Sequence, residues 1–217
     1  MSCCASCSGM NAQFDRRRAD RDLARYRREG PLASTRQLIE TLRSINTGIA
    51  SVLDIGCGVG AVGHEFLDRG VGRVTFVDFS EAYLAAARAE SERRHTVGRV
   101  TYHQGDFVAR ADDISQADAV VLDRVICCYP DMERLVSRAA DRAASLVGAV
   151  YPRGDWWIRA VIAAENAVRR VRGTAFRAFV HSPAAIDAAF QRAGLRRKSV
   201  ASGAIWTVAV YERAVGA

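Results

Sequence analysis

The 217-residue sequence contains no apolar run close to the ~20 residues that a membrane-spanning helix requires. Residues 1–11 are small and polar and lack the apolar segment of a secretory signal, so we expect a cytoplasmic protein. Because no signal for secretion is found, the six cysteines are expected to be reduced thiols rather than a disulfide framework.

Lysine is almost absent from the chain. Lys198 is the only lysine, so arginine supplies nearly all of the 31 basic residues behind the net charge of +7. The arginines are spread along the chain in short groups, such as residues 16–18 and 93–94, which is typical of solvated helix faces. We therefore expect a small-molecule partner rather than nucleic acid, and the sequence carries no signal for an oligomeric state.

Strands alternate with helices through most of the chain. The expected strands lie at residues 52–55, 74–77, 100–103, 119–122 and 147–151. This alternation predicts a parallel sheet with helices on both faces. The last two expected strands, residues 195–200 and 205–211, are joined by a connection too short for a parallel crossover, so they should be antiparallel. The expected fold is a Rossmann-like α/β domain whose mostly parallel sheet ends in an antiparallel C-terminal strand.

The length suits a single domain. We expect residues 1–33 to form a flexible, cysteine-containing tail and an N-terminal arm, and residues 34–217 to form the main domain, which begins with a helix capped by Ser34. Residues 155–181 are an insertion before the last helix. An apolar stripe in this insertion follows helical spacing and comprises Trp157, Val161, Ala164, Val168 and Val171.

Two interpretations of this insertion stay open. It is either a helix packed on the body of the domain or a lid. As a lid, Trp156 and Trp157 would close over an apolar or aromatic ligand, together with the arm around Phe14 and Tyr26.

A glycine-rich loop follows the first expected strand. Residues 54–60 read Asp-Ile-Gly-Cys-Gly-Val-Gly, and a strand, glycine loop and helix in this order present backbone N–H groups to a ligand. Asp78 ends the next strand, where a carboxylate can accept hydrogen bonds from both hydroxyls of a ribose. Asp106 follows the third strand and can accept from an adenine amino group, while Phe107 can pack on the ring. These three strand ends predict a site for an adenosine-containing ligand.

The loop suits two different cofactors. Gly58, Gly60 and Gly63 fit the G-x-G-x-x-G pattern of NAD-binding proteins, and Asp78 has the spacing of their ribose-binding acid. Asp54, two residues before the first glycine, would attract the ammonium group of S-adenosylmethionine (SAM) and repel a pyrophosphate. SAM is therefore favoured, and an NAD-dependent oxidoreductase stays an alternative.

From about Ser34 onward, these features together resemble the class I SAM-dependent methyltransferases, in which an antiparallel last strand is also usual. The resemblance implies an enzyme that uses SAM as its cofactor. It implies a cofactor-binding set that comprises Asp54, Gly56, Cys57, Gly58, Gly60, Asp78, Phe79, Asp106, Phe107 and Asp123. The acceptor would be a small, apolar or aromatic molecule, and no metal is expected.

The segment after the fourth expected strand, residues 123–131, should line the acceptor side of the site, since ligands of such sheets lie at the carboxyl ends of the strands. It combines a carboxylate, a guanidinium, two thiols and a phenol. Cys127 is equally well explained as a core residue. The candidates for orienting the acceptor or removing its proton are Asp123, Cys128, Tyr129 and His181, although a histidine before a helix is commonly structural.

Three short segments are similar to the magnesium-protoporphyrin IX O-methyltransferases. They are Phe-Asp-Arg at residues 14–16, Asp-x-x-Ile followed by Tyr-Pro within residues 123–130, and Phe-Arg-Ala-Phe-Val-His at residues 176–181. Those enzymes carry a histidine just before the Tyr-Pro pair, where this chain has Cys127 or Cys128. We therefore carry over the fold and the cofactor, favour O-methylation, and do not carry over the tetrapyrrole substrate.

Two further methyltransferase hypotheses stay open. Cys3, Cys4 and Cys7 include a C-x-x-C spacing without a second pair, and they would approach Cys127 and Cys128 if the arm folded over the site. The enzyme would then be a thiol or metalloid S-methyltransferase. An RNA methyltransferase is less favoured, because the chain lacks the Asn/Asp-Pro-Pro-aromatic segment of base-amino methylases and has a single lysine for a Lys-Asp-Lys-Glu site.

Overall fold

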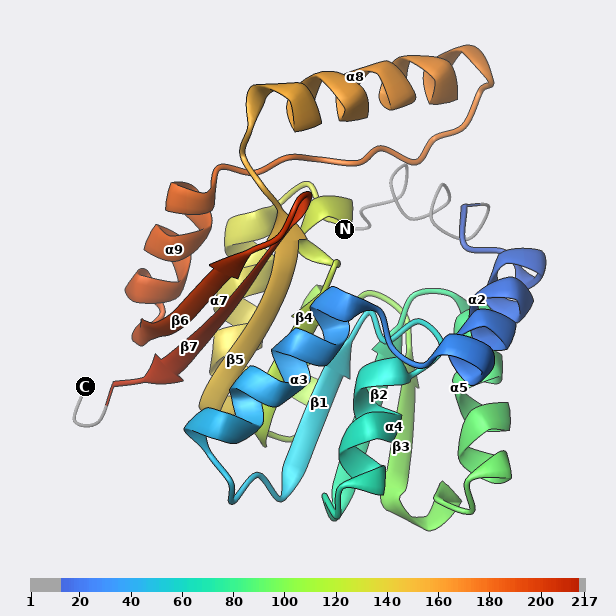
Figure 1. Ribbon diagram of the computed structural model, residues 1–217, viewed down its shortest axis with the longest axis vertical. Helices are drawn as coiled ribbons and strands as arrows, with labels where there is room; N and C mark the ends of the chain where they lie inside the picture. Colours follow the sequence, from blue (N-terminus) through green and yellow to red (C-terminus); the bar gives the residue numbers. More distant parts are fainter. Residues whose placement is uncertain (1–12, 215–217) are drawn as a thin grey trace.

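The computed structural model describes residues 13–214, which form a seven-stranded sheet between layers of helices (Figure 1). The strand order is β3-β2-β1-β4-β5-β7-β6. The strands are β1 (Ser51–Ile55), β2 (Arg73–Asp78), β3 (Val100–Gln104), β4 (Ala117–Asp123), β5 (Ala143–Pro152), β6 (Leu195–Ser202) and β7 (Trp206–Arg213). β1 to β5 are parallel, and β7 is antiparallel to both of its neighbours. The predicted fold class is confirmed.

Helices surround this sheet, and most of them pack against its two faces. They are α2 (Arg16–Glu29), α3 (Ala33–Ile45), α4 (Ala61–Asp68), α5 (Glu81–Arg93), α6 (Phe107–Arg110), α7 (Met132–Arg142), α8 (Trp156–Val171) and α9 (Pro183–Arg192). Three single turns, η1 (Val97–Arg99), η2 (Ala111–Asp113) and η3 (Ile126–Cys128), complete the described structure. Among residues 13–214, no helix is long and apolar enough to cross a membrane.

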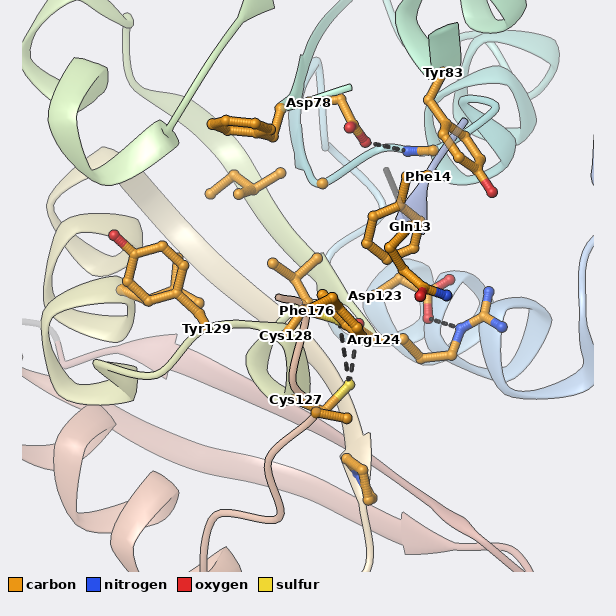
Figure 2. Close-up of a pocket in the computed structure, with 18 of the residues that line it drawn as sticks. Gln13, Phe14, Asp78, Tyr83, Asp123, Arg124, Cys127, Cys128, Tyr129 and Phe176 are labelled. Atoms are coloured by element: carbon orange, nitrogen blue, oxygen red, sulfur yellow. Dashed lines mark hydrogen bonds and ion pairs between the residues drawn. The ribbon is translucent and has the colours of Figure 1, made fainter. Parts of the chain in front are cut away.

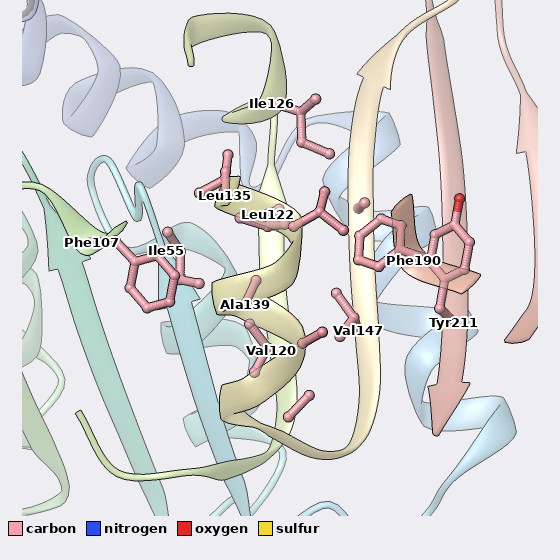
Figure 3. Close-up of a cluster of buried hydrophobic side chains, with 14 of the residues drawn as sticks. Ile55, Phe107, Val120, Leu122, Ile126, Leu135, Ala139, Val147, Phe190 and Tyr211 are labelled. Carbon is pink, nitrogen blue, oxygen red and sulfur yellow. The ribbon is translucent and has the colours of Figure 1, made fainter. Parts of the chain in front are cut away.

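Successive side chains of the strands point to opposite faces of the sheet and form a hydrophobic core on each face. Val120 points into a cluster with α6, α7 and α9, whereas Val121 points into a cluster with α3 and α4. Both neighbours are fully buried, because successive strand residues face opposite sides of a sheet that is covered on both faces. Figure 3 shows the first cluster, in which Phe190 of α9 stacks on Tyr211 of β7 with ring centroids 4.0 Å apart.

Helix α4 lies unusually close to β2. A Cβ on Gly63 would lie 2.3 Å from Phe76 Cε1 and 2.6 Å from Val74 Cγ1, so only glycine permits this approach. The contact fixes the start of α4, and with it the preceding glycine loop, against the sheet.

The start of the first helix of the main domain differs from the prediction. α3 begins at Ala33, and no side chain caps it. The backbone N–H of Arg36 donates to Leu32 O at 2.8 Å, so Leu32 occupies the capping position that was assigned to Ser34. The predicted cap was wrong because a backbone hydrogen bond closes the first turn at Leu32, two residues earlier.

The N-terminal arm is anchored to α5 by a buried carboxylate. Arg27 of α2 donates to Glu90 at 2.8 Å, and Arg93 and Arg94 donate to the same carboxylate, which is fully buried. Burial opposes its ionisation, but the hydrogen bonds from these three arginines lower the pKa of Glu90 to about 2. Tyr26 is buried at this junction and lies away from the sheet ends, so it does not join Phe14 over a ligand site.

Helix α8 covers little of the core. Figure 1 shows it beyond the carboxyl ends of the parallel strands, and Ile158 is its only buried residue. Val168 and Val171 of the predicted apolar stripe are 49% and 88% exposed. The interpretation of this stripe as a face packed on the body is therefore wrong.

Candidate active site

A cavity of about 560 Å³ opens at the carboxyl ends of β1, β2, β3 and β4 (Figure 2). Segments from α2, η3 and α8 complete its walls. The residues predicted for the site that line it are Gly56, Gly58, Asp78, Phe79, Asp106, Phe107, Asp123, Cys128 and Tyr129. A smaller cavity of about 150 Å³ shares Gly56, Gly58 and Asp123 with it and is also lined by Asp54 and Cys57.

Two predicted residues line neither cavity. Gly60 has a φ of 78° at the start of α4, and a Cβ there would lie 2.8 Å from His64 Nε2, so this glycine shapes the loop. His181 Nε2 lies 3.0 Å from Tyr129 O, and its ring stacks on Phe179. His181 therefore lies outside the cavities and supports the backbone of the segment that carries Tyr129.

The glycine loop contacts the segment after β4. Gly56 and Gly58 have φ values of 63° and 56°, which side-chain-bearing residues rarely adopt. A Cβ on Gly56 would lie 2.5 Å from Val125 Cγ2. The loop backbone thereby reaches the cavity floor, where Gly56 and Gly58 offer no side chain that would keep a ligand away.

Asp78 ends β2 and turns its carboxylate toward this loop (Figure 2). It accepts hydrogen bonds from Gly58 N at 2.9 Å and from Ser80 N at 2.8 Å. Burial outweighs these bonds and raises the pKa of Asp78 to about 6. The carboxylate is held in place but poorly solvated, so further donors from a ligand would favour its charged form.

Asp54 and Asp123 meet at the smaller cavity. Asp54 is 1% exposed and accepts one long bond from Gly63 N, at 3.3 Å. Burial, followed by the neighbouring charge of Asp123, raises the pKa of Asp54 well above its usual range. Asp123 is held by Thr35 Oγ1 at 2.6 Å and by Arg124 Nε at 3.2 Å. This pair of acids suits a cationic group.

Asp106 and Tyr129 form a further pair across the cavity. Tyr129 Oη lies 3.1 Å and 3.2 Å from the two carboxylate oxygens of Asp106. Asp106 also accepts from Val108 N at 3.0 Å and so caps α6. Tyr129 therefore orients the acid that was predicted to contact adenine. This hydrogen bond joins the segments that follow β3 and η3, and no local sequence pattern predicts it.

Cys127 and Cys128 both line the cavity, with their sulfur atoms 3.9 Å apart. The hydrogen bond from Cys127 lowers the pKa of Cys128, with help from the charges of Arg18 and Arg169 and against burial. The same contact and burial raise the pKa of Cys127. Cys128 is therefore the more readily ionised thiol of the pair.

The N-terminal arm and residues 155–181 meet over the cavity. Phe14 forms edge-to-face contacts with Tyr83 and Phe176, with ring centroids 5.9 Å and 5.5 Å apart. Ser80 Oγ donates to Phe14 O at 2.7 Å and fixes the arm at the end of β2. From α8, the lining residues are Trp157, Ile158, Val161, Ile162, Glu165 and Arg169, which only partly overlap the predicted stripe.

Three residues at the site were not predicted from the sequence. Arg18 and Tyr83 line the main cavity, and Thr35, which lines neither cavity, donates to Asp123. Tyr83 follows Asp78 within one helical turn of the Ser80 cap, which was the available signal. The other two reach the site only through contacts between segments far apart in the sequence.

Residues 52–145 match a protein family described as a methyltransferase domain. This match assigns a methyltransferase domain to residues 52–145 of the chain. The match confirms the predicted methyltransferase class and argues against the NAD-dependent oxidoreductase. Structures of this fold with bound SAM and SAH support the predicted cofactor. No curated protein matches this methyltransferase.

Solved structures share the fold of the methyltransferase. Magnesium protoporphyrin IX methyltransferase from Synechocystis PCC 6803 with bound SAM is 17% identical, with a TM-score of 0.70 and coverage of 96% of this chain and 97% of that chain. The same enzyme with bound SAH gives 18% identity, a TM-score of 0.67 and coverage of 88% and 94%. An O-methyltransferase family protein from Burkholderia thailandensis is 18% identical, with a TM-score of 0.71 and coverage of 94% and 63%.

The predicted N-terminal cysteine cluster of the methyltransferase, Cys3, Cys4 and Cys7, lies outside the described residues. Within residues 13–214, no group of three or more histidine, cysteine or acidic side chains is arranged to hold a metal ion. The three described cysteines, Cys57, Cys127 and Cys128, carry free thiols.

Proposed function

We propose that this methyltransferase transfers the methyl group of SAM to an oxygen atom of a small apolar or aromatic molecule. The observation that carries the proposal is the shape of the main cavity. One end is formed by the glycine loop and the acids at the strand ends, and the other by aromatic and aliphatic side chains of the arm and α8. Such a cavity accommodates a polar cofactor and an apolar acceptor side by side.

The acids fit the charges of the cofactor. No described cationic side chain forms an ion pair with Asp54, so the ammonium group of SAM would compensate the charge of Asp54 and Asp123. The ribose hydroxyls would donate to Asp78, and the adenine amino group to Asp106, with Phe107 against the ring. These assignments follow from donor and acceptor chemistry at three successive strand ends.

The acceptor side supplies orientation and exclusion of water. SAM provides a methyl group on a positively charged sulfur. The chain must align the acceptor oxygen with it and keep water away. Phe14, Trp157 and Phe176 would close over the acceptor, and α8, which buries a single residue, can move without disrupting the core.

A proton on the acceptor oxygen must also be removed. Asp123 and Cys128 line the cavity and can accept it, since Asp123 is held by Thr35 and the pKa of Cys128 is lowered by Cys127. Tyr129 would position the acceptor through its bond with Asp106. Oxygen as the acceptor atom is supported by analogy, because two structures with this fold are named as a magnesium protoporphyrin IX methyltransferase and an O-methyltransferase family protein.

Thermal unfolding with SAH, SAM, NAD and NADP tests the cofactor assignment. A ligand at 100 times its Kd adds about 2.7 kcal/mol to the free energy of unfolding. For a domain of this size the midpoint should rise by several degrees, at roughly 2–4 °C per kcal/mol. A shift with NAD or NADP alone would contradict the proposal.

Transfer of labelled methyl groups tests the acceptor. Purified protein is incubated with labelled SAM and a panel of phenols, aromatic carboxylic acids, aromatic thiols and short RNA. We expect label in the oxygen acceptors. Label in thiols alone would favour the S-methyltransferase, and label in RNA would refute a small-molecule acceptor.

A further inference from the structure

Two adjacent thiols share one wall of the main cavity. The sulfur atoms of Cys127 and Cys128 are 3.9 Å apart, and both lie near Arg124 O, at 3.3 Å and 3.7 Å (Figure 2). Both side chains line the cavity. Two sulfur atoms are therefore presented to the same volume and can bind one ligand together.

The backbone around the thiols is held on both sides. Arg124 has a φ of 62°, a left-handed conformation that costs energy for a residue with a side chain, and its N–H donates to Val150 O at 2.9 Å. Phe179 N donates to Cys127 O at 2.7 Å, and His181 Nε2 lies 3.0 Å from Tyr129 O. These contacts fix the spacing of the two sulfur atoms before any ligand arrives.

The electrostatic surroundings favour a thiolate. Arg18 of α2 and Arg169 of α8 act on Cys128 from opposite elements, while Asp78 opposes them. Cys127 remains the donor of the pair. Since the thiolate is the form that binds soft centres, this arrangement prepares Cys128 to form the first bond.

The number of ligands limits what the thiols can hold. Within residues 13–214 no third histidine, cysteine or acidic side chain joins them, so a four-coordinate zinc site is excluded there. Two thiols suit a sulfur-binding atom that carries three groups. The thiols displace two of these groups, and the third stays bound to the atom. Trp157, Ile158 and Phe176 line the same cavity and offer apolar walls for that substituent.

We propose that Cys127 and Cys128 form a binding site for a trivalent arsenical that carries one apolar organic substituent. The ligand R–As(OH)₂ would form two As–S bonds. Each bond takes the place of one As–OH bond, and each thiol proton leaves with a hydroxyl group as water. Arsenic remains trivalent, so neither an oxidant nor a reductant is consumed.

This site goes beyond the proposed methyl transfer and does not depend on it. The arsenical would occupy the part of the cavity assigned to the acceptor and would exclude the acceptor while bound. It would leave Asp54, Asp78 and Asp106 free, so SAH should still bind.

Phenylarsine oxide is the probe for the test. The full chain is prepared with Cys3, Cys4 and Cys7 changed to serine, so that Cys57, Cys127 and Cys128 are the remaining thiols. Intact mass under native conditions should show one phenylarsenic group per chain, bound with loss of two protons from the protein and release of one water. The dithiol 2,3-dimercaptopropanol should reverse the adduct.

Substitution locates the adduct. C128S and C127A should each weaken binding of phenylarsine oxide by at least about tenfold, because the second As–S bond forms within one complex. C57S, which changes a buried thiol outside the main cavity, should leave it unchanged. The SAH-induced rise in Tm is recorded for every variant as a check of folding.

Absence of an adduct in the chain that keeps Cys127 and Cys128, or an adduct that persists in C127A/C128S, would overturn the proposal. Because SAH binding is measured separately, either result is distinguishable from failure of the proposed function.

Discussion

Replacing Asp78 by asparagine should make the folded protein respond differently to pH. Burial raises the pKa of Asp78 from its usual 3.8 to about 6. Between these values the folded chain keeps a proton that the unfolded chain has released. The free energy of unfolding therefore falls as pH rises through this window, and the loss is complete above about pH 6.

The size of the effect follows from the shift. One pKa unit corresponds to about 1.4 kcal/mol, so a shift of about two units costs about 3 kcal/mol once the carboxylate is ionised. About 2 kcal/mol of this cost arises between about pH 4.5 and about pH 7.5. Asparagine carries no charge and avoids the cost. It also disturbs one of the bonds from Gly58 N and Ser80 N, but that loss does not depend on pH.

Urea unfolding of the wild type and D78N at these two pH values, without cofactor, measures the difference. The stability of D78N minus that of the wild type should be about 2 kcal/mol larger at the higher pH. With SAH, D78N should lose the rise in Tm. D118N is the matched control, because Asp118 accepts from Ala50 N and Ser51 N at the opposite end of the sheet and should not affect SAH binding.

Two results would refute the reasoning. A stability difference that does not change with pH would show that burial does not control the ionisation of Asp78. A D78N protein that keeps its SAH-induced shift would remove the ribose assignment.

Three other substitutions test the packing and the roles around the site. G63A should destabilise the protein by about 1–3 kcal/mol in urea unfolding, because its Cβ would lie 2.3 Å from Phe76. The control G98A places its Cβ in open space and should change the free energy of unfolding by less than about 0.5 kcal/mol. Equal destabilisation by the two substitutions would disprove the close approach of α4. H181A should cost about 1 kcal/mol of stability and leave the pH profile of methyl transfer unchanged, since His181 contacts Tyr129 O outside the cavity. Loss of the ascending limb of that profile at low pH would reinstate His181 as a base. E90Q should lower the free energy of unfolding by about 3 kcal/mol at neutral pH. The stabilisation by the ionised Glu90 is present above pH 4.5 and is lost as pH falls toward about 2. Equal stability of E90Q and the wild type at neutral pH would contradict this.

The residues at the strand ends of the cavity could be predicted from local patterns. In a parallel sheet the carboxyl ends of neighbouring strands meet at one edge, so Gly56, Asp78 and Asp106 had to approach one another once their strands were assigned. The short connection before β7 likewise required an antiparallel pair. These inferences succeeded because each depends on a few residues of contiguous chain.

The opposite side of the cavity was harder to predict. The apolar stripe of residues 157–171 predicted a buried face, yet the residues that line the cavity lie partly on an adjacent face of α8. Periodicity gives the width of an apolar face but not the direction in which the helix docks. His181 was likewise a candidate general base because of its imidazole, but it does not line the cavity.

The sequence by itself determined the elements, the class of sheet and the acids and glycines at the strand ends, because strand and helix periodicity and turn chemistry act over a few residues. Tertiary structure alone decided that Thr35 holds Asp123, that Arg18 and Arg169 act on Cys128, and that Phe14 meets Phe176 over the cavity. Each of these contacts joins segments far apart in the chain. Whether these segments meet depends on the strand order and on how α2 and α8 pack. Strand order and helix packing are determined by the burial of apolar surface over the whole domain and not by any local pattern.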